Sequence, residues 1–119
     1  MKIRAIAIDD EPRALEIIRY HSEKIPFLEL LDSFRNPFEA TSYLNKHEVD
    51  LIFLDINMPD ISGIQYVKTI EQQPMIIFTT AYSEFAVESY ELNAVDYLVK
   101  SIQLHRFTKA VNKAHQSQK

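Results

Sequence analysis

The sequence predicts an α/β fold, a doubly wound parallel sheet of five strands in the order 2-1-3-4-5. Segments rich in branched and aromatic residues recur along the 119 residues, and each of them is typical of a strand. The stretches between them place apolar residues at the spacing of amphipathic helices. Strict alternation in a chain this short implies parallel strands with right-handed crossovers, and there are too few strands for an eight-stranded barrel.

The expected strands are short and mostly apolar. They cover residues 3–8, 27–34, 51–55, 75–80 and 94–99. The first, third and fourth, IRAIAI, LIFLD and MIIFTT, are nearly continuous apolar runs. Such runs are typical of central strands that helices cover on both faces.

The expected helices lie between the strands and after the last one. One begins at Pro12, the next has Asn36 as its cap and Pro37 in its first turn, and Ser62 caps the third. The fourth, SEFAVESYELN (83–93), has no clean apolar stripe and is expected to leave apolar surface for a partner. The last helix has a clear stripe, formed by Phe107, Ala110, Val111 and Ala114.

Composition excludes several classes of function. With 46% hydrophobic and 25% charged residues, we expect one globular domain over residues 1–119. The net charge of -4 argues against nucleic-acid binding by this domain. The single glycine, Gly63, is too few for a P-loop or a dinucleotide-binding turn, and the absence of cysteine excludes thiolate metal sites. No run approaches a membrane span or a signal peptide, so we expect a cytoplasmic domain.

Polar residues stand where the strands end. Asp9 and Asp10 follow the first strand, Asp55 ends the third, Thr80 ends the fourth, and Lys100 follows the fifth. The carboxyl ends of parallel strands meet at one edge of a sheet, so these side chains are expected in one crevice. Clustered carboxylates repel unless a cation intervenes, and oxygen ligands favour Mg²⁺.

This set of residues suits phosphoryl transfer to a carboxylate. Asp55 would attack the phosphorus of a donor, the metal and Lys100 would offset the charge on the transferred oxygens, and the Thr80 hydroxyl would donate to one of them. The expected product is an aspartyl phosphate.

The whole chain resembles a receiver domain of a two-component response regulator, a family with a flavodoxin/CheY-like fold. The motifs that carry the resemblance are IDDEP, LDINMPDISG, FTTAY and DYLVK. It implies a signalling switch that receives a phosphoryl group on Asp55 from a histidine kinase, with Mg²⁺, and changes its output face to control an effector. It also implies that the domain is no enzyme, apart from assisting its own phosphorylation and dephosphorylation.

The resemblance also assigns the other site residues. Asp10 with Asp9 forms the acidic metal pocket, and Asn57 offers its backbone carbonyl to the ion. Thr80 and Lys100 are the switch hydroxyl and the phosphate-pairing lysine, and Tyr97 is the aromatic residue whose rotamer follows Thr80.

The stretch FAVESYELNAVDYLVK (85–100) further resembles receivers that precede LytTR-type DNA-binding domains in LytR/AlgR-like transcriptional regulators. These 119 residues contain no such effector, so either the effector lies in a longer protein or the domain acts alone. The output surface is expected at the fourth helix and fifth strand, and homodimerisation through that face is a hypothesis.

One departure from the family concerns the residue after Lys100, which is Ser101 where the family usually has proline. A cis bond before serine costs about 2.5–4 kcal/mol, against about 0.5–1 kcal/mol before proline. We therefore predict a trans bond or a strained cis bond, with consequences for the reach of Lys100.

Two other functions stay open. A pseudo-receiver would keep the pocket as a binding module without phosphorylation, and Ser101 is the feature that suggests it. A phosphohydrolase of the haloacid dehalogenase type also uses an aspartyl phosphate, but those enzymes place the nucleophile after the first strand.

Several charged residues have ordinary structural explanations. Asp60, beside Pro59, is expected to be a cap or a turn residue. The four histidines lie at unrelated spacings and are expected on the surface: His21, His47, His105 and His115. The basic residues of the last helix are expected to form a solvated face: Arg106, Lys109 and Lys113.

Overall fold

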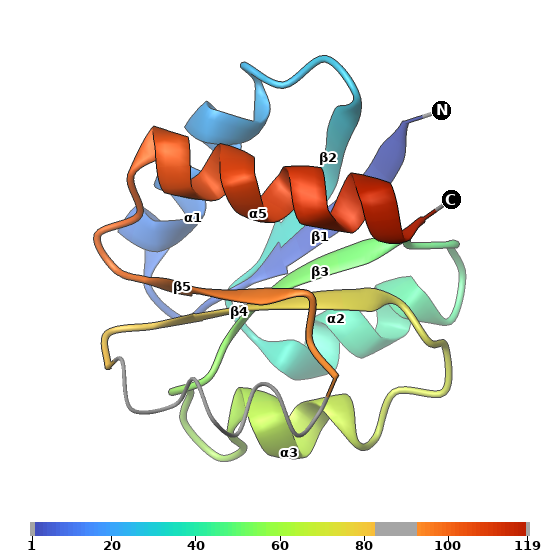
Figure 1. The fold of residues 1–119 in the computed structure, drawn as a ribbon. Helices are drawn as coiled ribbons and strands as arrows, with labels where there is room; N and C mark the ends of the chain where they lie inside the picture. Colours follow the sequence, from blue (N-terminus) through green and yellow to red (C-terminus); the bar gives the residue numbers. More distant parts are fainter. Residues whose placement is uncertain (1, 83–92, 119) are drawn as a thin grey trace.

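The computed structural model describes residues 2–82 and 93–118. Its five parallel strands form one sheet in the order β2-β1-β3-β4-β5, which confirms the predicted fold class (Figure 1). The elements in chain order are β1 (Ile3–Ile8), α1 (Pro12–Ser22), β2 (Leu28–Phe34), α2 (Pro37–Leu44), β3 (Leu51–Asp55), α3 (Gly63–Val67), β4 (Met75–Thr80), β5 (Asp96–Val99) and α5 (Leu104–Ser117). Three strands have the predicted bounds, whereas β2 and β5 begin one and two residues later than predicted. The expected fourth helix falls on 83–92, outside the described residues.

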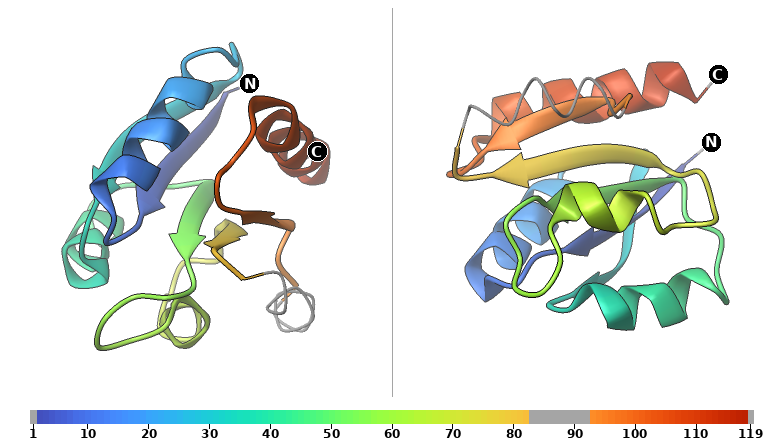
Figure 2. Two further views of the ribbon diagram at one scale, coloured as in Figure 1. Left: turned by 90° about the vertical axis from the view of Figure 1, so that its left-hand side faces the viewer. Right: turned by 90° about the horizontal axis from the view of Figure 1, so that it is seen from below.

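The helices cover the sheet on both faces. Helices α1 and α5 lie on one face and α2 and α3 on the other, and the two termini lie at the same end of the molecule (Figures 1 and 2). No helix in residues 2–82 and 93–118 is long and apolar enough to cross a membrane.

Two apolar clusters sandwich the sheet. Because side chains alternate along a strand, β1 sends Ala5 and Ala7 to the cluster under α1 and α5, and Ile6 and Ile8 to the cluster under α2 and α3. The predicted stripe of α5 is buried in the first cluster. Burial on both faces explains why the central strands read as unbroken apolar runs.

The helix starts follow the predicted caps. Asn36 Oδ1 accepts a hydrogen bond from the Phe38 amide, and Ser62 forms a capping box with Gln65. The first residue of helix α3 lies close to the backbone after β3, since the Gly63 amide donates to the Ile56 carbonyl at 2.8 Å. A Cβ on Gly63 would lie 2.3 Å from the Asp55 carbonyl oxygen, so the glycine lets α3 begin directly under the end of β3.

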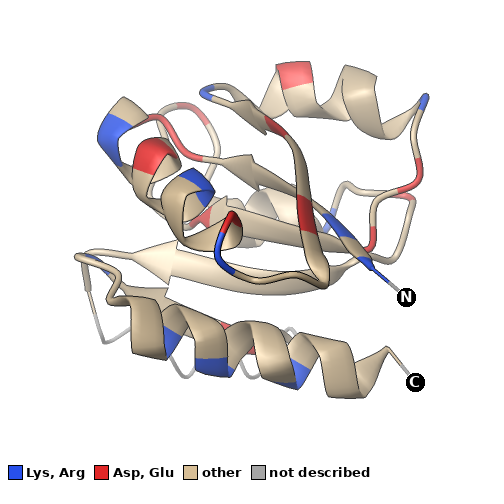
Figure 3. Ribbon diagram, turned by 90° about the horizontal axis from the view of Figure 1, so that it is seen from above, with Lys and Arg blue, Asp and Glu red and all other residues tan. Residues whose placement is uncertain are grey.

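The expected solvated face of α5 is wrong for Arg106, which is half-buried, whereas Lys113 is exposed as expected and also reaches an acidic partner. Arg106 binds both carboxylate oxygens of buried Asp96, at 2.8 and 2.7 Å, and Lys113 lies 3.3 Å from the same side chain. Burial alone would raise the pKa of Asp96, but these cations outweigh it and lower that pKa. The remaining basic residue, Lys109, is exposed, and Figure 3 shows the basic positions along α5.

The surface prediction is also wrong for one histidine. His47 and His105 are exposed, and His115 is half-buried against Phe27. His21, in contrast, is buried, with 9% of its surface exposed. Helix α1 therefore turns a polar ring toward the core, which needs a partner there.

Candidate functional site

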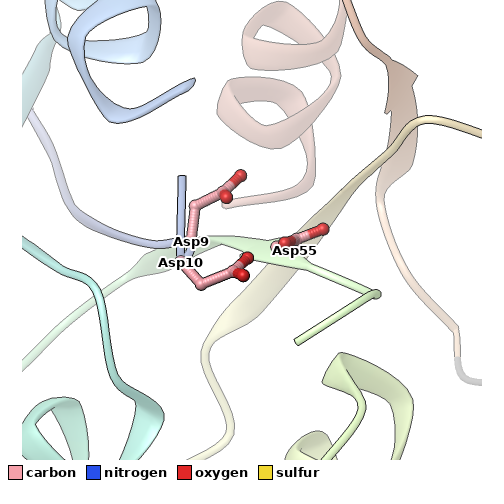
Figure 4. A group of neighbouring side chains, drawn as sticks. All are labelled: Asp9, Asp10 and Asp55. Atoms are coloured by element: carbon pink, nitrogen blue, oxygen red, sulfur yellow. The ribbon is translucent and has the colours of Figure 1, made fainter. Parts of the chain in front are cut away.

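Three carboxylates meet where β1 and β3 end. Ile8 of β1 pairs with Leu54 of β3, so Asp9 and Asp55 leave neighbouring strands side by side. Asp9 and Asp55 are buried and Asp10 is half-buried. Carboxylate oxygens of the three lie within 4.8 Å of one another, and Figure 4 shows the side chains gathered at this edge. The predicted cluster is therefore formed.

The backbone of both loops orients these carboxylates. Asp9 Oδ1 accepts a hydrogen bond from the Glu11 amide at 2.9 Å, and Asp55 Oδ1 accepts one from the Asn57 amide at 3.2 Å. Each aspartate thus turns the chain immediately after its strand. The same bonds hold the carboxyl groups in place at the strand ends.

Lys100 reaches the cluster from β5. Its Nζ lies 3.0 Å from Asp9 Oδ2 and 3.6 Å from Asp55 Oδ1. The peptide between Lys100 and Ser101 is cis, one of the two alternatives expected from the sequence. The Lys100 ammonium lies at the carboxylate cluster, beside Asp9 and Asp55, although proline does not follow the lysine.

Two further residues lie at this site, and the sequence assigns a role to neither of them. Glu11 lies 2.5 Å from Lys100 Nζ, and Arg35 donates to the Asp10 carbonyl at 3.3 and 3.4 Å. Glu11 stands within the IDDEP motif, so its position beside the pocket was visible. Its pairing with a lysine 89 positions away was not, because that contact depends on how the fifth strand is placed.

Burial and crowding shift the protonation of the cluster. Burial, followed by repulsion from Asp9, raises the pKa of Asp55 to about 8, and burial also raises the pKa of Asp9. Burial lowers the pKa of Lys100, but its bonds to Glu11 and Asp9 outweigh that effect and raise it. The site thus holds more negative charge than its one lysine balances.

The donor set fits a hard cation such as Mg²⁺. All the available ligands are oxygens, from Asp9, Asp10 and Asp55. Asp9 Oδ2 is buried and forms no hydrogen bond within the described residues, since Lys100 Nζ is near it but outside hydrogen-bonding geometry. A buried carboxylate oxygen without a hydrogen bond, next to two further carboxylates, is available as a ligand for a cation.

Thr80 and Tyr97 lie on the adjoining strands. The buried Thr80 hydroxyl donates to Asn57 Oδ1 at 3.2 Å and accepts from the Tyr82 amide at 3.1 Å. The Thr80 carbonyl accepts from the Lys100 amide at 2.8 Å, which ties the two residues together. Tyr97 is half-buried and packs against the cluster under α2 and α3.

Comparison with known proteins agrees with this geometry. Residues 5–112 match the model of the response regulator receiver domain family. The sensory transduction protein LytR of Staphylococcus haemolyticus is 41% identical over 114 residues, which cover 93% of this chain and 44% of that protein. The chain thus spans less than half of that relative's length.

Solved structures with the same architecture include two that are at least 30% identical. The response regulatory domain of mrkE from Klebsiella pneumoniae is 30% identical with a TM-score of 0.85, and the match covers 97% of both chains. The response regulator TrrA of Thermotoga maritima, solved in complex with Mg²⁺-BeF, is 32% identical with a TM-score of 0.81, over 96% of this chain and 99% of that one. This chain therefore belongs to the response regulator receiver domain family of two-component systems, with LytR transcriptional regulators among its relatives.

Proposed function

We propose that this domain is a phosphoacceptor switch in which Asp55 receives a phosphoryl group. The observation that carries the proposal is the placement of the Asp55 carboxylate. It is buried at the end of β3, beside Asp9 and Asp10, with the Lys100 ammonium at 3.6 Å. A nucleophile held by a rigid strand beside a metal-binding pocket and a cation has the equipment for phosphoryl transfer.

The transfer begins with attack by an Asp55 carboxylate oxygen on the phosphorus of the donor. A new O–P bond forms while the bond from phosphorus to the leaving group breaks, and the leaving group keeps the electron pair. Asp55 attacks as the carboxylate, although in the metal-free site its pKa is raised to about 8. Asp9, Asp10 and Asp55, with the backbone carbonyl of Asn57, would hold Mg²⁺, whose positive charge would favour this ionised form.

Two side chains then change partners. Lys100 moves from its pairing with Glu11 and Asp9 to a phosphoryl oxygen, where its charge is needed. The Thr80 hydroxyl leaves Asn57 and donates to another phosphoryl oxygen. Tyr97, on the strand beside Thr80, follows this movement and reshapes the face of the fourth helix and fifth strand.

The relatives support a proposal for the biological setting. A histidine kinase supplies the phosphoryl group, and an effector in a longer, cytoplasmic protein reads the change, with residues 1–119 as the receiver. The LytR relatives, which are named as sensory transduction or transcriptional regulatory proteins, support an effector that controls transcription, of the LytTR DNA-binding type. The product stays on the chain, so the domain acts as a signal rather than as an enzyme, and the fourth-helix face is the proposed dimer surface.

Intact-mass measurement tests the acceptor. The wild type, Asp55→Asn and the control Asp60→Asn are incubated with acetyl phosphate, in Mg²⁺ and in chelator. Asp60 is an exposed turn residue with φ of 71°, a conformation that asparagine also adopts readily. One phosphoryl group is expected on the wild type and on Asp60→Asn in Mg²⁺ only, and none on Asp55→Asn.

The opposite outcomes are equally informative. No addition to the wild type would identify a pseudo-receiver, and addition to Asp55→Asn would place the acceptor elsewhere. Continuous release of phosphate from added esters would favour the phosphohydrolase, although Asp55 follows the third strand and not the first.

A further inference from the structure

The buried ring of His21 contacts the segment that follows Lys100. His21 Nε2 lies 2.9 Å from the Ile102 carbonyl oxygen, across 81 positions of sequence. A carbonyl only accepts, so Nε2 is the donor. The other ring nitrogen, Nδ1, is buried and has no hydrogen-bond partner within residues 2–82 and 93–118. The bond to Ile102 is therefore the polar contact that orients the ring.

Packing holds the ring in this orientation. The centroid of the His21 ring lies 5.4 Å from that of Phe107 in α5 and 6.1 Å from that of Tyr20 in α1. Phe107 is fully buried and Ile102 is nearly so. The donor is thus fixed by two helices and aimed at the connection between β5 and α5.

Two surface hollows lie between that connection and α1. A surface hollow of about 420 Å³ is lined by residues that include Tyr20, His21 and Ile102. A second hollow, of about 140 Å³, is lined by residues that include Ala14 and the segment Lys100 to Ile102. The backbone from Lys100 to Ile102 thus borders the surface, and the bond from His21 is a buried polar contact that ties it to α1.

Lys100 stands between two anchors. Its amide donates to the Thr80 carbonyl at 2.8 Å, and two residues later the Ile102 carbonyl accepts from His21. We propose that His21 is a positioning residue, which holds the backbone after Lys100 so that the ammonium stays at the carboxylate cluster. The inference rests on the proposed function, because it concerns the lysine that pairs with the transferred phosphoryl group.

The proposal separates two binding events. The carboxylates leave β1 and β3, whereas the hydrogen bond of His21 reaches the segment after β5. Loss of the His21 donor is therefore expected to leave the affinity for Mg²⁺ alone unchanged. Binding of beryllofluoride, a phosphoryl analogue, in saturating Mg²⁺ is expected to weaken about five- to tenfold, because Lys100 is then less well placed.

The experiment compares His21→Phe, which keeps a ring and removes the donor, with His21→Gln, which keeps a donor. Each is made in the wild type and in Lys100→Met, and calorimetry measures both affinities. In the wild-type background, His21→Phe is expected to weaken beryllofluoride binding, whereas His21→Gln is expected to bind within about twofold of the wild type. In the Lys100→Met background, neither substitution is expected to change the affinity. Ser22→Ala is the control, since it removes another buried hydrogen bond of α1, to Ile18.

The proposal would be overturned if beryllofluoride binding weakened equally in the wild type and in Lys100→Met, or if Mg²⁺ affinity fell in parallel, because either result would show a general structural effect.

Hydrogen exchange of the Lys100 amide, measured without metal, tests the positioning even if Asp55 accepts no phosphoryl group. About tenfold faster exchange is expected in His21→Phe and unchanged exchange in Ser22→Ala. Unchanged exchange in His21→Phe, or a His21→Gln variant that folds but behaves like His21→Phe, also contradicts the proposal.

Discussion

At the scale of single residues, Asp55 shows why the site needs a cation. Its side chain has lost nearly all contact with water and lies beside two further carboxylates. A carboxylate in such a place is costly unless it is protonated or paired. The sequence shows that a charged group ends an apolar strand, and the structure adds that one lysine, shared with Asp9 and Glu11, is its nearest counter-charge.

The Asp55→Asn variant is expected to be more stable than the wild type in chelator. The folded-state pKa of about 8 lies above the ordinary value of 3.8, so the folded wild type retains a proton that the unfolded chain has lost. Its stability is therefore full below about pH 4 and falls as the pH rises toward 8. Asparagine does not titrate, so the advantage of the variant is expected to grow between pH 5 and pH 8, to on the order of 2 kcal/mol.

Urea unfolding at the two pH values, with and without Mg²⁺, measures this difference. Mg²⁺ is expected to stabilise the wild type and to shrink the gap, because binding to the folded state alone adds stability. The exposed Asp60→Asn serves as the control, and because it retains Asp55 its stability is expected to fall between pH 5 and pH 8 as that of the wild type does. An advantage that is the same at pH 5 and pH 8 would contradict the explanation.

At the scale of elements, the site depends on how two helices approach the sheet. Helix α3 begins in contact with the end of β3, which the absence of a side chain at Gly63 permits. Helix α5 is tied to β5 by the pairing of Arg106 with Asp96. The first contact lies beneath Asp55, and the second fixes the strand that carries Lys100.

Replacing Gly63 by alanine is expected to destabilise the protein by about 1–3 kcal/mol, since the new methyl group would overlap the Asp55 carbonyl and force the backbone to shift. The same shift should slow phosphorylation by acetyl phosphate. Lys68→Ala, at an exposed position at the end of the same helix, is expected to change stability by less than about 0.5 kcal/mol. Urea unfolding measures the change in stability, and intact mass measures the rate of phosphorylation. A Gly63→Ala variant that matches the wild type in both would refute the close approach of Gly63 to the Asp55 carbonyl.

At the scale of the whole molecule, the helices pack against the sheet through two buried apolar clusters. In the cluster under α1 and α5, the ring of Phe107 stacks on that of Phe53, with centroids 5.1 Å apart. This contact joins the last helix to the central strand β3. The strand ends can hold charged groups in place because the core beneath them is rigid.

Phe107→Ala is expected to lower the free energy of unfolding by about 3–5 kcal/mol, from the loss of buried surface and the cavity left behind. Domains of this kind are stable by only about 5–15 kcal/mol, so a loss of this size is a large fraction of the total. Phe38→Ala is the matched control, because that ring is 56% exposed, and a change of less than about 0.5 kcal/mol is expected. Thermal or urea unfolding compares them, and equal losses would contradict the assignment of the core.

Several features could be predicted from the sequence by itself, because they follow from local patterns. Apolar runs at strand spacing and stripes at helix spacing gave the order of elements, and the sheet edge followed from the rule that parallel strands end together. Those rules alone predict that Asp9, Asp10, Asp55 and Lys100 share one crevice, as they do in the structure.

Only the tertiary structure decided which side chains meet across the molecule. The pairing of Lys100 with Glu11, the bond from His21 to Ile102 and the pairing of Arg106 with Asp96 depend on how α1 and α5 dock on the sheet. A polar residue looks the same in sequence whether it faces water or a partner, because burial is set by distant segments. That is why His21 and Arg106 were expected at the surface and were found bound.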